Sequence, residues 1–381
     1  MDFSLTEDQK MLKTMVRDFA ETELEPIAAQ IDEEARFPAE SIKKMAKLGL
    51  MGIPFPEEYG GSGGGPIGFA IAEEEISCVC ASTGAIYFVT AGLAGQPLYR
   101  FGNEEQRQRF VVPVANGEKL ACFALTEASA GSDVAALETT ATRQNGGYIL
   151  NGNKLFITNG NEADIAVVFA TIDKSLRHRG VTGFIVEKGT PGFSVGKLEH
   201  KLGIRASSTA ELIFEDCFVP EANRLGSEGE GFRIALDAID SSRLSVAAQA
   251  VGIAQGAFDK ALTYAKDRQQ FGQPIANFQA IQWMLADMAT QIDAARLLTY
   301  RAAYLEEKGL PFVKEAAMAK VFAAEAAMFV TTKAIQIYGG YGYVKDYPLE
   351  RYFRDAKICG IYEGTDEMQR MTIARNLIRE G

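Results

Sequence analysis

The first hundred or so residues of the chain repeat apolar positions with the spacing of α-helices. Thr6 and Gln9 have the spacing of a capping box, which predicts a helix that begins directly after Thr6. The apolar side chains that follow predict one buried helical stripe, made of Met11, Leu12, Met15, Val16 and Phe19. The same period returns over residues 41–50 and 69–80. These patterns predict an N-terminal helical domain, residues 1–118.

From about Leu120 the chain changes to short apolar stretches of the length of β-strands. Residues 148–150 and 155–158 flank Asn151-Gly152-Asn153, a sequence typical of a hairpin turn. Further short strands, with turn residues between them, are predicted over residues 163–172, 181–187, 193–198 and 210–218. Because no helical pattern separates these strands, they predict a small antiparallel barrel or sandwich, residues 119–226.

After Gly231 the helical period returns and persists almost to the end of the chain. Four long helices are predicted, over residues 232–268, 277–307, 314–338 and 365–379. Since short turns join them, we expect antiparallel packing into a four-helix bundle, residues 227–381. The predicted fold class is therefore α+β multidomain, with a helical domain, a β domain and a C-terminal four-helix bundle in that order.

The composition is that of an ordinary globular protein. Of the 381 residues, 47% are hydrophobic and 23% are charged, which excludes a disordered chain. The net charge of -11 argues against a nucleic-acid-binding protein, because such binding needs a surplus of lysine and arginine. An anionic small molecule would need locally placed basic groups.

Cysteine and histidine usage argues against a metal site and against a disulfide framework. The five cysteines are spread along the chain without a Cys-x-x-Cys pair, and the only histidines are His178 and His200. Isolated buried thiols are the simpler interpretation.

Two segments resemble signals for export or membrane insertion in position or length, but neither has the required features. Residues 1–8 are acidic and lack the basic-then-apolar pattern of a signal peptide. Residues 76–99 carry no charge, but they contain Pro97 and several hydroxyl side chains and have no flanking basic cluster. We therefore expect a buried helix or pocket wall there, no membrane span, and a cytoplasmic protein.

The side chains suited to chemistry are concentrated in four loops that mix glycine with hydroxyl or carboxylate groups. These loops are residues 124–136, 156–160, 336–343 and 361–367. Taken alone, the first is explained equally well as a polar turn with a Ser or Asp helix cap. No P-loop accompanies the loops, and no Gly-x-Gly-x-x-Gly follows a predicted strand, so NAD binding is poorly supported.

Two of these loops carry long motifs, through which the chain resembles the acyl-CoA dehydrogenases over essentially its whole length. Residues 124–136 fit the first characteristic motif of that family. Residues 336–355 fit the second, with the expected spacing of Gly339, Gly340, Gly342, Asp346, Arg351 and Asp355. The resemblance is closest to short-chain, butyryl-type bacterial members. It implies an FAD-dependent enzyme that removes the α and β hydrogens of a saturated acyl-CoA and leaves a trans-2-enoyl-CoA.

The resemblance also implies which carboxylate takes the α-proton. Family members place this base either in the Tyr-Glu-Gly-Thr loop, here Glu363, or at the position held here by Ser242, which cannot act as a base. We therefore expect Glu363 to be catalytic, with Ile361 and Tyr362 as an apolar wall that raises its pKa toward neutrality. By family analogy, the backbone N–H of Glu363 and a flavin ribityl hydroxyl would bind the thioester oxygen, and hydride would pass to flavin N5.

The cofactor contacts implied by the resemblance fall into three groups. The flavin ring and pyrophosphate would contact Phe123, Leu125, Thr126, Ser132, Phe156 and Thr158. The FAD of a neighbouring subunit would contact Arg268, Gln270, Phe271, Gln279, Gln336, Gly339 and Gly340. Thr365 and Glu367 would follow the base along the same cofactor. Since this cofactor site needs two chains, the resemblance implies a homotetramer built as a dimer of dimers.

The substrate contacts implied by the resemblance lie on three segments. Ser132, Asp240 and Arg243 match positions that hold CoA, and Tyr362 and Gly364 flank the base. Asp240 and Arg243 are also explained as an ordinary ion pair on one helix face. Residues 86–99 should line the acyl end of the pocket, and no arginine among residues 85–98 offers a partner for a second substrate carboxylate.

The implied electron acceptor is an electron-transfer flavoprotein, and three other functions stay open. The first is a dehydrogenase for a branched or alicyclic acyl-CoA. The second is an acyl-CoA oxidase-type flavoenzyme on the same scaffold. The third is a flavin-binding homologue that has lost its base, which the presence of Glu363 counts against.

Overall fold

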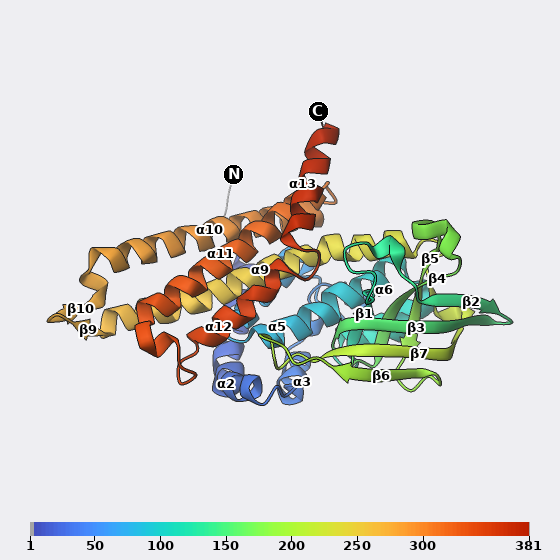
Figure 1. Cartoon of the computed structure of the whole chain (residues 1–381), viewed down its shortest axis with the longest axis horizontal. Helices are drawn as coiled ribbons and strands as arrows, with labels where there is room; N and C mark the ends of the chain where they lie inside the picture. The colour runs from blue at the N-terminus through green and yellow to red at the C-terminus, as the bar shows by residue number, and fades with distance from the viewer. Residues whose placement is uncertain (1–3, 381) are drawn as a thin grey trace.

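The computed structural model describes residues 4–380, so the first three residues of the acidic N-terminal stretch lie outside the described part of the chain. Figure 1 shows the long C-terminal helices at one end of the molecule and the β-sheet at the other, with the N-terminal helices between and below them. The three-part α+β architecture predicted from the sequence is confirmed.

The first helix begins as the sequence predicts. The Thr6 hydroxyl caps α1 (Glu7–Phe19) by accepting the N–H of Gln9 at 3.2 Å, and the Gln9 side chain accepts the N–H of Thr6 at 3.0 Å. The predicted stripe is partly wrong, because Val16 and Phe19 are buried whereas Met11 is 64% exposed. Met11 and Met15 lie one position away from the row of Leu12, Val16 and Phe19, and a helix turns each successive residue by about 100°.

Several short helices complete this domain. They are η1 (Ala20–Leu24), α2 (Glu25–Glu33), α3 (Ala39–Lys47), η2 (Leu50–Gly52), η3 (Glu57–Tyr59), α4 (Gly65–Ser77), α5 (Ala81–Tyr87), η4 (Phe88–Ala94), α6 (Gly95–Phe101), α7 (Glu104–Gln106), η5 (Arg107–Val111) and α8 (Val112–Ala115). The uncharged stretch forms the end of α4, then α5, η4 and α6, and it is almost entirely buried, as predicted. Within residues 4–380, no helix has both the length and the apolar character needed to cross a membrane.

The middle domain is built on one sheet in the order β6-β7-β3-β2-β4-β5-β8, with β1 beside β4. Its strands are β1 (Ala121–Ala124), β2 (Thr140–Gln144), β3 (Gly147–Thr158), β4 (Ile165–Thr171), β5 (Val181–Glu187), β6 (Phe193–Leu198), β7 (Thr209–Pro220) and β8 (Arg224–Leu225). The predicted β domain is confirmed, but its sheet is mixed where an antiparallel one was expected, because β1 and β2 both pair with β4 in parallel. β1 enters the sheet from the helical domain and not through a hairpin, so nothing forces it to reverse direction.

The predicted hairpin at residues 151–153 is also wrong. β3 continues through these residues, and Gly152 has a φ of 144° at a register shift between β3 and β7. The Asn151 side chain bonds across the sheet to Asp216, donating to its carboxylate at 3.1 Å and accepting its N–H at 2.8 Å. The glycine therefore makes a bulge, and the chain turns at residues 145–146, between β2 and β3.

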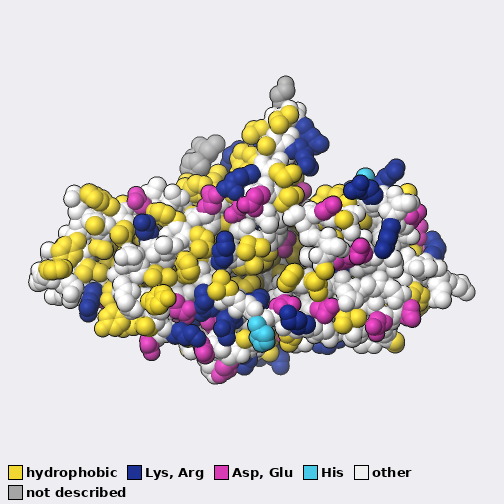
Figure 2. Space-filling view, viewed as in Figure 1, with side chains coloured by type: hydrophobic (Ala, Val, Ile, Leu, Met, Phe, Trp, Pro, Cys, Tyr) yellow, Lys and Arg dark blue, Asp and Glu magenta, His cyan; other side chains and the backbone are white. Residues whose placement is uncertain are grey.

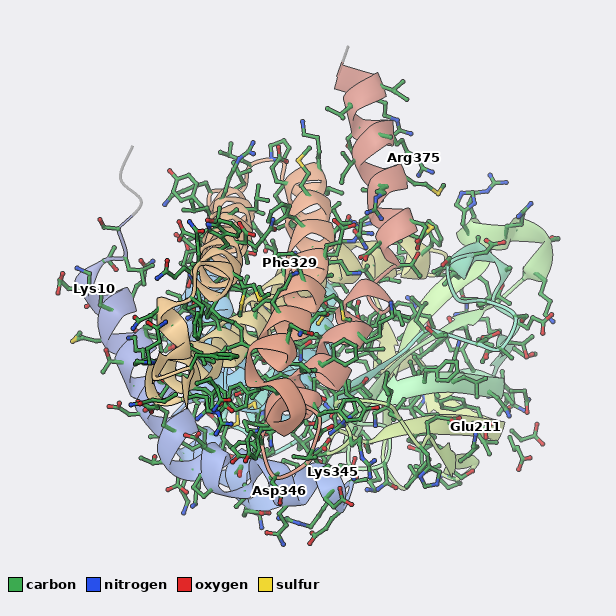
Figure 3. The ribbon with its side chains drawn as sticks, turned by 60° about the vertical axis from the view of Figure 1, so that its left-hand side comes forward. Lys10, Glu211, Phe329, Lys345, Asp346 and Arg375 are labelled. Carbon is green, nitrogen blue, oxygen red and sulfur yellow. The ribbon has the colours of Figure 1, made fainter. Side chains whose placement is uncertain are left out.

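The four long C-terminal helices are confirmed, with ends within about two residues of the predicted ones. The elements of this domain are α9 (Gly231–Asp267), β9 (Gln269–Gln270), β10 (Gln273–Pro274), η9 (Ile275–Asn277), α10 (Gln279–Glu307), α11 (Val313–Tyr338), η10 (Gly339–Gly342), α12 (Leu349–Ala356), η11 (Lys357–Gly360) and α13 (Asp366–Glu380). The short helix α12 was not predicted. α9, α10 and α11 pack against one another, whereas α13 packs on α11 and then stands clear of the body, where Figure 3 labels Arg375.

An ion pair connects the C-terminal domain to the first domain. The ammonium of Lys345, which Figure 3 labels in the loop between α11 and α12, lies 2.6 Å from the carboxylate of Glu33 at the end of α2. Because both side chains are exposed, this pair contributes little energy. It nevertheless marks where segments far apart in the sequence meet.

Candidate active site

The loop before α13 holds Glu363 in a strained conformation. Glu363 has a φ of 52°, in the left-handed region that non-glycine residues rarely adopt, and Gly364 follows with a φ of 85°. The buried side chain of Gln369 donates to the carbonyl of Glu363 at 3.0 Å and to that of Gly364 at 2.8 Å. The buried Lys320 ammonium, on α11, donates to the same Gly364 carbonyl at 2.9 Å. Such over-determined strain is typical of a functional site.

Burial raises the pKa of Glu363 to about 7. The charges of Arg243 and Lys320 oppose this shift, as does the hydroxyl of Ser242. A carboxyl group with a pKa near neutrality can take up and release a proton at physiological pH, which is the property of a general base. Within residues 4–380, the backbone N–H of Glu363 donates to no acceptor, so it is available to a ligand.

The environment of Glu363 differs in one respect from the prediction. Tyr362 packs edge-on against Phe88 of η4, with 5.8 Å between the ring centres, and its hydroxyl bonds to the side chain of Gln249. Ile361, in contrast, is 48% exposed, so the prediction that it walls the base is wrong. The chain is turning out of η11 there, and this turn leaves Ile361 on the outer side.

A cavity of about 250 Å³ lies where α4, α6 and α9 meet the end of α10. It is lined by Phe69, Gly92, Gln96, Tyr99, Arg100 and Ser242, among others. Because Ser242 also lies beside Glu363, the cavity adjoins the candidate base. The prediction that residues 86–99 line this pocket therefore agrees with its walls.

Arg100 lies just beyond the segment in which no arginine was found. Its guanidinium donates to Glu306 at 2.6 Å and to Asp237 at 3.1 Å, so it is already neutralised. It offers no free positive charge for a second carboxylate on a substrate.

Two of the residues predicted to hold CoA lie together on α9, next to the base. The guanidinium of Arg243 pairs with the Asp240 carboxylate, as the simpler interpretation of their spacing predicts. Burial lowers the pKa of Arg243, and the charge of Glu363 acts in the opposite direction. Ser132 is exposed on the loop that follows β1. An ion pair with one buried nitrogen unsatisfied, Nε of Arg243, is suited to bind a polar ligand.

The first group of predicted FAD residues is brought together at the edge of the sheet. Phe123 and Leu125 are buried at the end of β1, and the carbonyl of Thr126 accepts the N–H of Leu155 in β3 at 2.8 Å. This bond places Thr126 next to the strand that carries Phe156 and Thr158. Phe156 has a φ of 58°, and its aromatic ring is 62% exposed. The backbone strain is unusual for an aromatic residue whose ring covers no other group. The group fits a flat ring system placed over Phe156.

A buried ion pair that the sequence analysis missed clamps these two segments together. The Lys154 ammonium, on β3, donates to the carbonyl of Leu125 at 3.1 Å and to the carboxylate of Glu127 at 2.6 Å. Glu127 in turn accepts the backbone N–H of Thr139 at 3.0 Å. Burial lowers the pKa of Lys154 to about 8, although Glu127 opposes the shift. The sequence signal for this pair was the position of Lys154, a lysine within a strand in which apolar residues alternate.

Asn159 lies in the second of the four predicted loops, residues 156–160, and no role was predicted for it. It is fully buried with a φ of 63°, and its amide donates to the carbonyl of Ile86 at 3.2 Å and to the hydroxyl of Thr90 at 3.1 Å. It therefore fixes the end of β3 against the helices that line the cavity.

The second group of predicted FAD residues lies at the opposite end of the molecule. Arg268, Gln270, Gly339 and Gly340 line a cavity of about 470 Å³ at the end of the bundle, near the β9–β10 hairpin at the left of Figure 1. A side chain added at Gly339 or Gly340 would meet nothing within 4 Å, so both glycines leave open space. Phe271 is 93% exposed on the hairpin, Gln279 begins α10, and Gln336 is exposed near the end of α11.

The two groups therefore do not meet within one chain. The sheet that carries the first group is at the right end of Figure 1, and the hairpin of the second is at the left end. Thr365 and Glu367 lie between them, at the start of α13, where the Thr365 hydroxyl accepts the N–H of Met368 at 3.4 Å.

Three family models match successive parts of the chain. The acyl-CoA dehydrogenase N-terminal domain matches residues 6–118, the middle domain residues 122–217 and the C-terminal domain residues 229–378. Together they cover most of the chain.

Relatives match this chain over its whole length. A short-chain specific acyl-CoA dehydrogenase of Clostridium acetobutylicum is 52% identical over 379 residues, covering 100% of both chains. An acryloyl-CoA reductase (NADH) of Anaerotignum propionicum is 53% identical over 381 residues, covering 100% of this chain and 96% of the relative.

Solved structures agree with these matches. A chain from work on the electron transferring flavoprotein of Acidaminococcus fermentans superposes with a TM-score of 0.99 at 52% identity, over 100% of both chains. The butyryl-CoA dehydrogenase of Megasphaera elsdenii superposes with a TM-score of 0.98 at 46% identity, also over 100% of both chains. The strained acidic loop beside a small cavity thus sits in a known framework: the chain belongs to the acyl-CoA dehydrogenase family, FAD-dependent oxidoreductases that act on a CH–CH bond of an acyl-CoA.

Proposed function

We propose that this chain oxidises a short-chain acyl-CoA to the trans-2-enoyl-CoA, with Glu363 as the base that removes the α-proton. The observation that carries the proposal is the state of Glu363: its pKa is raised to about 7, and its free N–H lies in a strained loop beside a small cavity. An α C–H next to a thioester is a weak acid. Its removal therefore needs both a proton acceptor and a donor to the developing enolate oxygen.

The chain's own residues divide these tasks. The Glu363 carboxylate accepts the proton, while its N–H donates to the thioester oxygen. Lys320 and Gln369 donate hydrogen bonds to the carbonyls of the loop, which fixes the N–H and the carboxylate of Glu363 in position relative to each other. Phe156 and Thr158 would hold FAD, which would supply the acceptor for the hydride from the β carbon. Asp240, Arg243 and Ser132 would hold the CoA part, with Tyr362 and Gly364 beside the acyl group.

The size of the cavity supports a short acyl group. Its volume of about 250 Å³ lies below the ~300–1,000 Å³ usual for ligand pockets. Phe69 closes the cavity against Gly92, since a Cβ on Gly92 would approach the Phe69 ring to 2.8 Å. A branched or alicyclic acyl group remains the alternative substrate. Anaerobic bleaching of the flavin against straight, branched and cyclic acyl-CoAs tests the proposal. Rapid bleaching with a C4 straight chain is expected, and bleaching by none of the panel would contradict it.

We also propose a homotetramer built as a dimer of dimers, in which each FAD contacts two chains. The separation of the two groups of FAD residues supports this state, since one cofactor cannot touch both ends of the same chain. Exposed apolar side chains on the hairpin and on α13, Phe271 and Ile378 among them, supply surface that association would bury. Light scattering of the FAD-loaded protein should give four times the mass of one chain.

We propose an electron-transfer flavoprotein as the electron acceptor, and the cytoplasm as the location of this protein. The structural match from work on an electron transferring flavoprotein supports the first, and five buried free thiols fit a reducing compartment. The 53% identity to an acryloyl-CoA reductase favours one second candidate, which is reduction of a short enoyl-CoA by the same site. Reoxidation of the reduced flavin by oxygen alone, faster than by the flavoprotein, would instead point to an oxidase.

A further inference from the structure

Glu73, on α4, carries a fully buried carboxyl group that has no task in the proposed reaction. On the face of the molecule drawn in Figure 2, acidic side chains lie at the surface among basic ones, where water and ion pairs stabilise their charge. The Oε1 atom of Glu73 instead accepts the hydroxyl of Ser77 at 2.7 Å. Its Oε2 atom has no hydrogen-bond partner in the described part of the chain. Because buried polar atoms are almost always bonded, this atom needs an explanation.

A second buried polar atom without a partner lies close to Glu73. The hydroxyl of Tyr87, on α5, bonds to no other group within residues 4–380. Burial raises the pKa of Tyr87 well above its usual value and Glu73 adds to the shift, so the two groups lie within electrostatic range of each other. Gly84 makes room for the carboxyl, since a Cβ there would lie 2.5 Å from Oε1 of Glu73. Two polar groups that can form further bonds are therefore enclosed between α4 and α5.

These two groups lie next to the wall of the acyl cavity. Phe69 lines that cavity, and Glu73 follows Phe69 one turn later on the same face of α4. The ring of Tyr87 packs against the ring of Phe69, with 4.8 Å between their centres. Burial raises the pKa of Tyr362 well above its usual value, and Glu73 adds to this shift as well. The Glu73 carboxyl is therefore near both the cavity wall and the residue that precedes the base.

The chemistry of the pair suits an uncharged polar ligand. Burial raises the pKa of Glu73 well above its usual value, although the Ser77 hydroxyl opposes the shift, and this favours the uncharged carboxyl. An uncharged carboxyl group and a tyrosine hydroxyl can each both donate and accept a hydrogen bond. A charged ligand would have to lose its water in these apolar surroundings, whereas a hydroxyl group carries a much smaller desolvation cost.

We propose that Glu73 and Tyr87 bind a hydroxyl group at the end of a short acyl chain, so that the substrates of this site include ω-hydroxyacyl-CoA thioesters. This inference rests on the proposed function, because it takes the thioester to lie beside Glu363 and the acyl chain to run along Phe69. It gives both unpartnered atoms a ligand. An acyl chain that ends in a methyl group would leave them unbonded, which weakens binding.

The test compares ligands in which a hydroxyl group replaces a methyl group of similar size. One pair is trans-4-hydroxycrotonyl-CoA and trans-2-pentenoyl-CoA. The other, one carbon longer, is 5-hydroxy-trans-2-pentenoyl-CoA and trans-2-hexenoyl-CoA. All four carry the double bond of the proposed product, so the enzyme has no α and β hydrogens to remove from them. Calorimetry on the FAD-loaded full chain measures their binding.

Three variants accompany the wild-type protein. Glu73→Leu removes the carboxyl group, and Tyr87→Phe removes the unpartnered hydroxyl. Tyr300→Phe is the control, because its hydroxyl also bonds to α4, at Glu74 and 2.9 Å, but Tyr300 does not line the cavity.

We expect wild type to bind the hydroxyl member of at least one pair about tenfold more tightly than the methyl member, because buried polar groups discriminate against a ligand that cannot bond to them. The preference should fall to about twofold or less in Glu73→Leu and should shrink in Tyr87→Phe. It should persist in Tyr300→Phe. If Glu73→Leu does not fold, the wild-type comparison and Tyr87→Phe still decide.

Either of two results would overturn the proposal. The first is a wild-type protein that binds the methyl member of both pairs as tightly as the hydroxyl member, which would assign the two polar atoms to a buried water molecule. The second is a preference in Glu73→Leu as large as that of wild type. Failure of the proposed function is distinguishable, because it would appear as a wild-type flavin that no acyl-CoA bleaches, whichever enoyl-CoA binds more tightly.

Discussion

The Ser242 hydroxyl lies beside the Glu363 carboxylate and lowers its pKa, although Ser242 belongs to α9 and Glu363 to the loop before α13. The two positions at which the family places its base are therefore neighbours in space. In this chain Ser242 leaves Glu363 as the carboxylate of that pair.

Replacing Glu363 by Gln should abolish the chemical step while leaving binding intact. The amide keeps the size of the side chain but cannot accept the proton, and loss of a general base costs about 10²–10⁴-fold in rate. Stopped-flow measurement of anaerobic flavin bleaching checks this, with crotonyl-CoA binding as the control. A variant that bleaches within about threefold of wild type, a change under ~1 kcal/mol, would exclude Glu363 as the base.

The rate of flavin bleaching should rise with pH, with a midpoint near 7 in the free enzyme. Only the deprotonated carboxylate accepts a proton, and burial raises the pKa of Glu363 to about 7.

The free energy of unfolding should change with pH in the opposite direction to the rate. The folded-state pKa lies above the ordinary 4.5, so the stabilising effect is fully present below pH 4.5 and is lost as the pH rises through 7. The melting temperature of Glu363→Gln minus that of wild type should therefore be larger at pH 8 than at pH 5.

Replacing Lys320 by Met should impair the base without removing it. The ammonium donates to the Gly364 carbonyl, pairs with Asp366 at 3.1 Å and lowers the pKa of Glu363. We expect bleaching to slow by about 10–100-fold, since misplacing a catalytic group by an ångström has effects of that order. The midpoint of the pH profile should move above 7. Lys333→Met, on the same helix, is the control, and an unchanged midpoint in Lys320→Met would contradict the role.

Replacing Arg268 by Ala should weaken FAD binding while the chain stays folded. Arg268 lines the cavity at the end of the bundle, with its guanidinium 5.6 Å from the ring of Tyr341. Gel filtration with flavin absorbance measures retention of the cofactor, and circular dichroism measures folding. Arg370→Ala, an exposed pair with Glu325, is the control. Full retention of FAD would count against a cofactor site at this end of the bundle.

Breaking the Glu127–Lys154 pair from one side should cost more than removing it entirely. Glu127→Leu leaves an unpaired ammonium among buried groups, with an expected loss of about 3–5 kcal/mol in the free energy of unfolding. Glu127→Leu/Lys154→Met removes both charges and should recover part of that loss. Urea unfolding of the apoprotein gives the stabilities, and FAD titration shows whether the loop of Thr126 is still in place. Equal losses in the single and double variants would refute the clamp.

Much of the fold followed from local patterns. The capping box at Thr6, the long helices of the bundle and most strands were predictable, because each depends on neighbours within a few residues. The hairpin at residues 151–153 was not, because Asn151 bonds to Asp216 on another strand and converts the expected turn into a bulge. For the same reason, no local signal indicated that β1 would run parallel to β4.

The family, the candidate base and the types of residues around it could be predicted from the sequence, since they depend on motifs that are contiguous in the chain. The tertiary structure decided what surrounds the base. It placed Ser242, Arg243 and Lys320 next to Glu363 and left Ile361 outside. It also separated the two groups of FAD residues to opposite ends of the molecule. The physical reason is that a pKa depends on burial and on nearby charges, and both are set by how distant helices pack.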